Sequence, residues 1–410
     1  MVWTPRWNED WFNQWLPSSP KGVVLFGARQ TGKSSLIKKI RQFAGDSLLY
    51  NYASTKTLND HRISLEPCRG EILAALEGRK HGNIPLTVFV DEAPRNAAMF
   101  DLAQELMDIH KGELRFVLTG SSARQLLDGS ANRLPGRVFQ REMWPLALGE
   151  LGGAANAKDA MVFGLLPEIT HMGMGREELL ASYSGIYVRE EIEQENLVKS
   201  PEIFSRFLPL ASAEAGGLLN HAKLARQLGI APQTVKRFYE ILVSTKVAFY
   251  LTPFTNGHDR KEVIQTPKFY WFDNGVRNAL ASRPLQASLL NLEGGLLFEH
   301  LLVQEAAKTI AALSSPKNPI RMHYWRSHNG REVDLVLQSG VGKTALFEFK
   351  FTATPDVASI KGIPLFLESN KTLKAKSFIV APLPRDQTIG NLRCLTVESY
   401  VRTLKEFVTA

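Results

Sequence analysis

The residues best suited to chemistry stand in one short segment near the start of the chain, GARQTGKSS. It fits the pattern G-x-x-x-x-G-K-[ST], in which the glycines let the backbone curl so that its N–H groups point at phosphate oxygens. Lys33 can reach the β- and γ-phosphates of a nucleotide, and Ser34 can ligate Mg²⁺. The segment therefore predicts a site for ATP and Mg²⁺, lined by Gly27, Ala28, Arg29, Gln30, Thr31, Gly32, Lys33, Ser34 and Ser35.

Two acids, Asp91 and Glu92, follow the apolar run LTVFV. On a strand of a parallel sheet, this ending places both carboxylates at the carboxyl edge, beside the phosphate loop. There Asp91 would hold Mg²⁺ through water and Glu92 would polarise the attacking water. Alone, the two acids would suit a surface turn better, but together with the phosphate loop they predict a hydrolytic site.

Polar residues for the same edge follow the next apolar run, LRFVL. We expect Ser121 to orient the lytic water, with Ser122 and Thr119 as alternatives. Arg133 and Arg137 come after it, and a planar guanidinium meets phosphate oxygens in pairs. If the chain forms a ring, Arg137 could act on the nucleotide of a neighbouring subunit, although a surface salt bridge suits each arginine equally well.

The middle of the chain has the rhythm of a helix-turn-helix. AKLARQL predicts a short helix that Gly229 ends, Pro232 suits the start of a second helix, and KVAFYL could form the hairpin of a winged helix. If the second helix reads DNA, its exposed amino-terminal half carries Gln233, Thr234, Lys236 and Arg237. The alternative is a packing module or lid that touches no DNA.

Near the carboxyl end, EVDLVLQ and LFEFKF predict two strands that carry charged residues. Glu348 and Lys350 are two positions apart and share one side of a strand. With Asp334, and with Glu299 from the preceding helix, they could bind Mg²⁺ and direct water at a phosphodiester, Asp334 and Glu348 being the metal ligands. The arrangement resembles the PD-(D/E)XK nuclease-like fold. An inactive fold of this type, used for DNA binding or oligomerisation, is the alternative.

These residues need elements to position them. Apolar runs at 23–26, 47–53, 86–90 and 114–118 alternate with helical patterns, which predicts a parallel sheet covered on both faces. Trp3, Trp7, Trp11 and Trp15 recur every fourth residue and predict a helix that packs its indoles on the sheet or on a neighbouring subunit. The pattern turns helical from about residue 177 to 251 and becomes mixed again from residue 268 onward.

Composition limits the class of protein. The chain has 410 residues, a net charge of +8 and two cysteines. That length predicts two to four domains, and the basic excess weakly favours polyanionic partners. Two cysteines exclude a disulfide framework, and no apolar run reaches the roughly 18 residues that cross a bilayer. We expect a cytoplasmic protein without a membrane partner.

The order GARQTGKSS, VFVDE, LTGSSARQLL, LPGRVF and WPLALGEL resembles the bacterial and archaeal AAA-type ATPases that carry a C-terminal domain of unknown function. The likeness continues through YWFDNGVRNAL, GGLLFEHLLVQE and REVDLVL, and so covers nearly the whole chain. It departs at Ala93-Pro94, where the family has a glutamine in second place. The resemblance implies an α/β chain: an AAA-type P-loop ATPase core with the Trp-rich helix (1–151), a helical lid (160–210), a winged helix (211–265) and a restriction-endonuclease-like domain (266–410).

The function that these features predict is an ATP-hydrolysing machine acting on nucleic acid. We expect DNA, including branched DNA, as the partner, self-association into a ring (a hexamer is favoured), and translocation, unwinding or branch migration as the output. One alternative is a nucleotide-switched regulatory or defence protein that binds DNA. The other is a metal-dependent nuclease that ATP gates.

Overall fold

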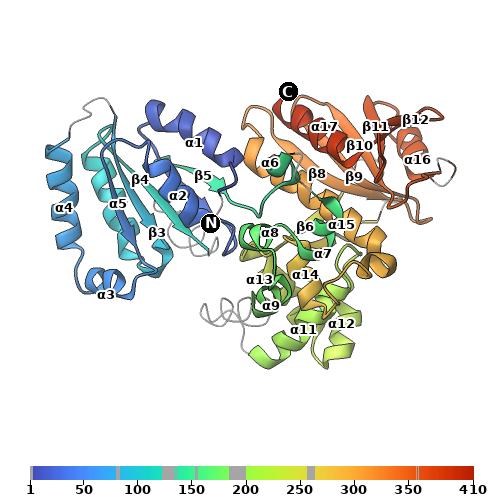
Figure 1. Ribbon diagram of the computed structural model, residues 1–410, viewed down its shortest axis with the longest axis horizontal. Helices are drawn as coiled ribbons and strands as arrows, with labels where there is room; N and C mark the ends of the chain where they lie inside the picture. Colours follow the sequence, from blue (N-terminus) through green and yellow to red (C-terminus); the bar gives the residue numbers. More distant parts are fainter. Residues whose placement is uncertain are drawn as a thin grey trace. The chain divides into compact units, whose positions relative to one another are not determined.

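The computed structural model describes residues 3–79, 84–121, 134, 136–152, 156–183, 200–255, 264–356, 358 and 360–410. The contacts within the chain define two compact units. The nucleotide unit comprises Trp3–Trp144 with Ser244–Lys246, and the C-terminal unit comprises Pro145–Val243 with Val247–Ala410 (Figure 1). No helix among the described residues is both long and apolar enough to span a membrane.

The nucleotide unit is built on a five-stranded sheet whose strands are all parallel. The strands are β1 (Gly22–Phe26), β2 (Ser47–Asn51), β3 (Leu86–Asp91), β4 (Leu114–Gly120) and β5 (Val138–Glu142), in the order β2-β3-β4-β1-β5. Four of them lie where the apolar runs predicted strands, whereas β5 was not expected, because its residues are half-exposed or exposed and form no apolar run. All five carboxyl ends lie at one edge of the sheet.

Helices cover both faces of this sheet. They are α1 (Trp7–Ser18), α2 (Lys33–Arg41), α3 (Thr55–Ile63), α4 (Glu66–Glu77), the short η1 (Ala93–Arg95) and α5 (Ala98–Ile109). Because side chains alternate along a strand, Val23 and Leu25 of β1 pack against α1 and α2, while Val24 packs in the cluster that includes α4 and α5. Trp15 is buried in the first cluster, and Trp3 precedes the helix that the tryptophan spacing predicted.

An eight-stranded mixed sheet forms the centre of the C-terminal unit, in the order β12-β13-β11-β10-β9-β8-β6-β7. The strands are β6 (Ala248–Pro253), β7 (Lys268–Trp271), β8 (Ile320–Arg326), β9 (Glu332–Ser339), β10 (Thr344–Phe349), β11 (Ala375–Val380), β12 (Gln387–Ile389) and β13 (Leu392–Leu395). β9 is antiparallel to both of its neighbours, β8 and β10, and β10, β11 and β13 are parallel.

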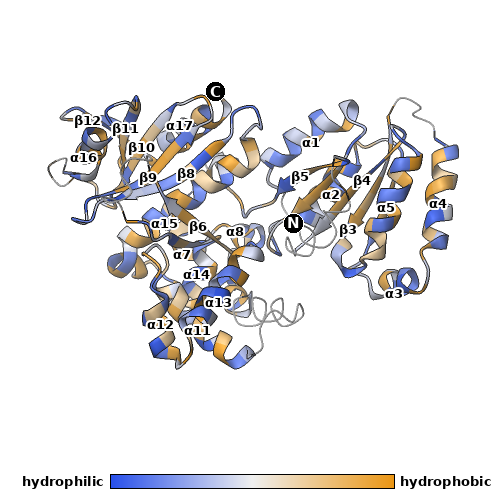
Figure 2. Ribbon diagram, turned by 180° about the vertical axis from the view of Figure 1, so that it is seen from behind, coloured by the Kyte–Doolittle hydropathy of each residue, from blue (hydrophilic) through white to orange (hydrophobic). Residues whose placement is uncertain are grey.

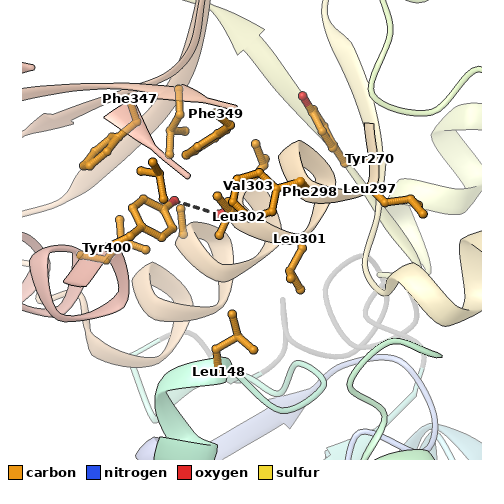
Figure 3. Packing of buried hydrophobic residues seen from close by; sticks show 14 of the residues in the cluster. Leu148, Tyr270, Leu297, Phe298, Leu301, Leu302, Val303, Phe347, Phe349 and Tyr400 are labelled. Atoms are coloured by element: carbon orange, nitrogen blue, oxygen red, sulfur yellow. Dashed lines mark hydrogen bonds between the residues drawn. The ribbon is translucent and has the colours of Figure 1, made fainter. Parts of the chain in front are cut away.

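The helices of this unit are α6 (Leu148–Leu151), α7 (Ala157–Phe163), α8 (Pro167–His171), α9 (Arg176–Ser182), α11 (Pro201–Ala213), α12 (His221–Leu228), α13 (Pro232–Ser244), α14 (Asn274–Leu280), α15 (Leu289–Leu313), α16 (Gly362–Ser369) and α17 (Val397–Thr409). α15 and α17 pack on one face of the sheet, where Tyr400 Oη donates to the Leu302 carbonyl at 2.8 Å (Figure 3). α16 packs on the other face through Ile363 and Phe366. Figure 2 shows the apolar colouring of the strands between these helices.

The expected lid, winged helix and nuclease-like domain belong to one contact unit rather than three. The reason is the sheet itself: β6 pairs with β7 on one side and with β8 on the other. The hairpin expected for a winged helix thus crosses the boundary expected at residues 265 and 266, and continues into the C-terminal sheet. Residues 153–155 and 184–199, in the expected connection and lid, lie outside the described residues.

Candidate functional site

The phosphate loop lies between the end of β1 and the start of α2, as its sequence predicted. Gly32 has a φ of 98°, a left-handed conformation that glycine adopts without steric cost. At Gly27 a Cβ atom would lie 2.1 Å from the Met143 carbonyl oxygen, so only glycine fits there. The backbone therefore curls tightly at both ends of the segment and leads directly into a helix N-terminus.

Lys33 is buried and reaches back across the loop. Its Nζ donates to the carbonyls of Gly27 and Ala28, at 2.9 Å each. Thr31 Oγ1 donates to the same Ala28 carbonyl at 2.8 Å, and Ser34 is exposed in the first turn of α2. The ammonium thus lies inside the curve of the loop, where a lysine that binds phosphates is needed.

Arg6 is a residue of this site that sequence reasoning did not identify. Its guanidinium is buried and donates to the Thr31 carbonyl at 2.9 Å and to the Trp144 carbonyl at 2.8 Å. A segment just before α1 is thereby bonded to the phosphate loop and to the chain that follows β5. No local pattern could have identified it, because its partners are far away in the sequence.

Asp91 and Glu92 lie at the carboxyl edge of the sheet, one on β3 and one just after it. Thr119 Oγ1 donates to Asp91 Oδ1 at 2.6 Å, and Ser121 Oγ donates to Glu92 Oε2 at 3.4 Å. Glu92 has a φ of 55°, an unusual conformation for a residue with a side chain and one that is found at functional sites. Since β4 alone separates β3 from β1, Asp91 is about 10 Å from the base of the loop across the sheet.

The residues at this edge fit ATP with Mg²⁺. The loop offers backbone N–H groups and a helix N-terminus, Lys33 supplies the positive charge, and exposed Ser34 and buried Asp91 supply oxygens of the kind that Mg²⁺ prefers. The structure brings together the predicted residues of the loop, both acids and Ser121.

Arg137 is not at this edge. Its carbonyl accepts from the N–H of Gly22 at 2.9 Å, so it lies at the amino end of β1, opposite the phosphate loop. Its guanidinium pairs with Asp108 through two hydrogen bonds, of 2.8 and 2.7 Å. Arg137 therefore does not face the nucleotide of its own chain, and its pair with Asp108 is the surface salt bridge that the sequence left as the alternative to a role on a neighbouring subunit. Arg133 and Ser122 lie outside the described residues.

The helix-turn-helix residues lie on α13, which follows α12 after a short turn. Gln233, Lys236 and Arg237 are exposed and Thr234 is half-buried, while Val235 is buried in the unit. Lys236 and Glu240 form an exposed pair at 3.7 Å, which partly offsets the positive charge of this face.

In the C-terminal unit the four predicted residues come together. Asp334 on β9 and Glu348 on β10 lie on paired strands, and the Phe349 N–H donates to Asp334 Oδ2 at 2.7 Å. Lys350 Nζ donates to Glu348 Oε1 at 2.8 Å. Burial, with the charges of Glu348 and then Glu299, raises the pKa of Asp334 well above its usual value. We call these residues, with the two described next, the carboxylate–lysine cluster.

Lys268 and Glu332 are members of this cluster that sequence reasoning missed. Lys268 Nζ donates to Glu299 Oε1 at 2.8 Å and also bonds Glu332 Oε1, and its side chain is only 4% exposed. Tyr270 Oη donates to Glu299 as well, at 2.6 Å. Burial by itself would lower the pKa of Lys268, but these neighbours and Asp334 raise it well above its usual value.

The carboxylates of the cluster have the chemistry of Mg²⁺ ligands. Glu299, Glu332 and Asp334 each offer an oxygen, and these oxygens lie within 4.8 Å of one another, which suits a cation. Glu348 Oε2 is buried and has no hydrogen-bond partner among the described residues. However, the ammonium of Lys268 already bonds two of the three carboxylates. The residues do not fit a metal ion while Lys268 holds this position.

Three family models match consecutive parts of the chain. The family described as "AAA domain" matches residues 19–152. Two families described as domains of unknown function, DUF8612 and DUF4143, match residues 155–287 and 294–400. The parallel sheet, the phosphate loop and the first match together support an AAA-type P-loop ATPase domain over residues 19–152.

The chain is also similar to particular proteins. It is 26% identical over 343 residues to the uncharacterized proteins Mb2031c of Mycobacterium bovis and Rv2008c of Mycobacterium tuberculosis, covering 82% of this chain and 71% of each relative. Among solved structures, the Walker-type ATPase PABY2304 of Pyrococcus abyssi superposes with a TM-score of 0.44 and 16% identity, over 67% of this chain and 94% of that one. Cdc6p of Pyrobaculum aerophilum superposes with a TM-score of 0.27 and 14% identity, over 71% and 97%.

Proposed function

We propose that this chain hydrolyses ATP with Glu92 as the general base and uses the cycle to act on DNA. The observation that supports the proposal best is the carboxyl edge of the nucleotide sheet. There a phosphate loop with an inward lysine stands beside two carboxylates that Thr119 and Ser121 orient.

Each residue has a distinct task in this proposal. The N–H groups of the loop and Lys33 hold the β- and γ-phosphates, and Ser34 and Asp91 hold Mg²⁺. The metal ion, when bound, offsets the charge of the phosphates. Glu92 accepts a proton from the attacking water, and the hydroxyl of Ser121 holds the carboxylate of Glu92 in place for that transfer.

Two variants test the hydrolytic site. Lys33→Ala should weaken ATP binding, whereas Glu92→Gln should bind ATP normally and lose turnover by a factor of about 10²–10⁴, the usual contribution of a general base. Glu77→Gln, an exposed glutamate on α4, is the matched control. Normal turnover by Glu92→Gln would remove Glu92 as the base, and failure of the wild-type chain to bind any nucleoside triphosphate with Mg²⁺ would end the whole proposal.

The basic, exposed face of α13 supports DNA as the partner. This face of α13 is better suited to contact phosphates than base edges, because its charged side chains are long and solvent-exposed. Reversing Lys236 and Arg237 to Glu should weaken DNA binding and lower the slope of log affinity against log salt by about 2. Reversing the exposed Lys371 and Lys374 makes the same change in net charge elsewhere, and should have a much smaller effect. If the two reversals weaken DNA binding equally, the helix-turn-helix does not contact DNA and its role is structural.

Steady-state ATPase assays separate a motor from a switch. We expect turnover by an oligomeric motor, in a ring that brings Arg137 to the next subunit, to rise with single-stranded, duplex or four-way-junction DNA. The assay should be run at two salt concentrations, because phosphate contacts weaken with salt. Turnover indifferent to every DNA would favour the nucleotide-switched regulatory protein instead.

The remaining candidate is an ATP-gated nuclease with its site at Asp334, Glu348 and Lys350. The convergence of these residues with Glu299 supports a nuclease-like fold for the C-terminal unit. Cleavage of plasmid or branched DNA in Mg²⁺ or Mn²⁺ that Asp334→Ala abolishes would support the nuclease. If no cleavage occurs with either metal, the nuclease is excluded, and the C-terminal unit would serve in DNA binding or assembly instead.

A further inference from the structure

The carboxylate–lysine cluster holds a cation that belongs to the chain. Lys268 extends from β7, and its Nζ lies 2.8 Å from Glu299 Oε1 and bonds Glu332 Oε1. These two carboxylates and Asp334 are the three whose oxygens are spaced to share one ion. We infer that the ammonium of Lys268 takes the place of a divalent cation in this cluster and keeps metal ions out of it.

The charge of the cluster supports this assignment. Fully ionised, the cluster together with Arg326, which pairs with Glu332 at 3.0 Å, holds four carboxylates against three cations, a net charge of −1. With Lys268 in place, adding a divalent cation would leave an unbalanced positive charge in a buried region. Without Lys268 the charge would be −2, which one divalent ion neutralises. Buried charges need such balance, so the cluster accommodates one cation or the other.

The position of Lys268 is fixed by more than its ammonium. Its residue pairs with Leu251 in the β6–β7 hairpin, and a bridge joins it to Leu218, just before α12. Its Nζ lies 5.5 Å from the centre of the Tyr324 ring, and Tyr270 bonds the same oxygen of Glu299 that Lys268 does. Lys268 is therefore a built part of the site and not a surface lysine that folds over it by chance.

Binding of Mn²⁺ to the full-length, nucleotide-free chain tests the inference directly. Isothermal titration should find no site in the wild-type chain that Asp334→Asn removes. Lys268→Met keeps most of the length of the side chain and deletes its charge. This variant should gain one Mn²⁺ site per chain, and the double variant Lys268→Met/Asp334→Asn should lose it again. Mn²⁺ should also raise the melting temperature of Lys268→Met but not that of the wild type.

A matched control distinguishes position from charge. Lys350→Met removes the same charge from the same cluster but leaves Lys268 between Glu299 and Glu332, so it should gain no Mn²⁺ site. Gain of a site by Lys350→Met, or a folded Lys268→Met that binds no Mn²⁺, would overturn the inference. So would Mn²⁺ binding by the wild-type chain that depends on Asp334, a measurement that holds even if Lys268→Met does not fold. None of these results depends on the nucleotide site.

Discussion

Arg6 is expected to set the affinity for ATP without touching it. Its guanidinium bonds the carbonyl of Thr31 in the phosphate loop and that of Trp144 beyond β5. Arg6→Met fills the same buried space with an apolar side chain and removes both hydrogen bonds. The Thr31 carbonyl, on a residue with no exposed surface, then loses a charged donor.

The size of the effect follows from these two bonds. A hydrogen bond to a charged group contributes about 1.5–3 kcal/mol, so the bond to Thr31 stabilises the present loop conformation by about 2 kcal/mol. Since 1.4 kcal/mol is a factor of ten, loss of about 2 kcal/mol should raise the Kd for ATP by up to about 30-fold. The second bond brings the loss of folding stability to about 4 kcal/mol.

Arg141→Met provides the matched control. Arg141 ties the same N-terminal segment down, with hydrogen bonds of 3.1 and 2.8 Å to Asn8 Oδ1 and a guanidinium 4.9 Å from the Trp11 ring. Arg141→Met should lower the melting temperature by a similar amount. It should leave the Kd for ATP within about twofold, because the hydrogen bonds of Arg141 stabilise the N-terminal segment and not the phosphate loop. Titration with a fluorescent ATP analogue measures both variants. If Arg6→Met binds ATP like the wild type, or if Arg141→Met weakens binding equally, the loop contact of Arg6 has no such role.

Three further outcomes are expected. Thr119→Val removes the 2.6 Å hydrogen bond to Asp91 and should raise the Mg²⁺ concentration needed for half-maximal turnover by about tenfold; an unchanged Mg²⁺ dependence would contradict this. Arg137→Ala should cut turnover by about 10³-fold or more at concentrations where the chain assembles, and leave the diluted chain unaffected; a concentration-independent effect would argue against a role in trans. Burial, with the nearby Arg277 and Lys308 charges, lowers the pKa of His300 to about 3, so the unfolded chain takes up a proton below pH 6.5 that the folded chain does not. Stability should therefore fall from pH 6.5 toward pH 3 by up to about 1.4 kcal/mol per pH unit from this group, and chemical denaturation of His300→Gln should show a slope smaller by one proton.

The nucleotide site could be predicted from sequence because its parts are contiguous. A strand, a glycine loop and a helix follow one another in GARQTGKSS, so the local chain by itself dictates their geometry. Asp91 and Glu92 were placed by the same logic, since parallel strands end at one edge of the sheet. The strand β5 was not predicted, because its half-exposed and exposed residues carry no apolar pattern.

Contacts between distant residues were decided only by the tertiary structure. Whether Thr119 bonds Asp91 depends on β3 and β4 being neighbours, and whether Arg6 meets Thr31 depends on how α1 packs on the sheet. Neither follows from a local pattern, because each arises from the order in which strands and helices assemble.

Lys268 shows most clearly which contacts depend on the tertiary structure. In the sequence it is one lysine before an apolar strand, and its type suits a solvent-exposed position as well as a buried one. The pairing of β6 with both β7 and β8 brings it to the carboxylates of α15 and β9. The sequence by itself determined that acids and a lysine would meet near Asp334 and Glu348, but only the order of strands in the sheet decided which cation would stand among them.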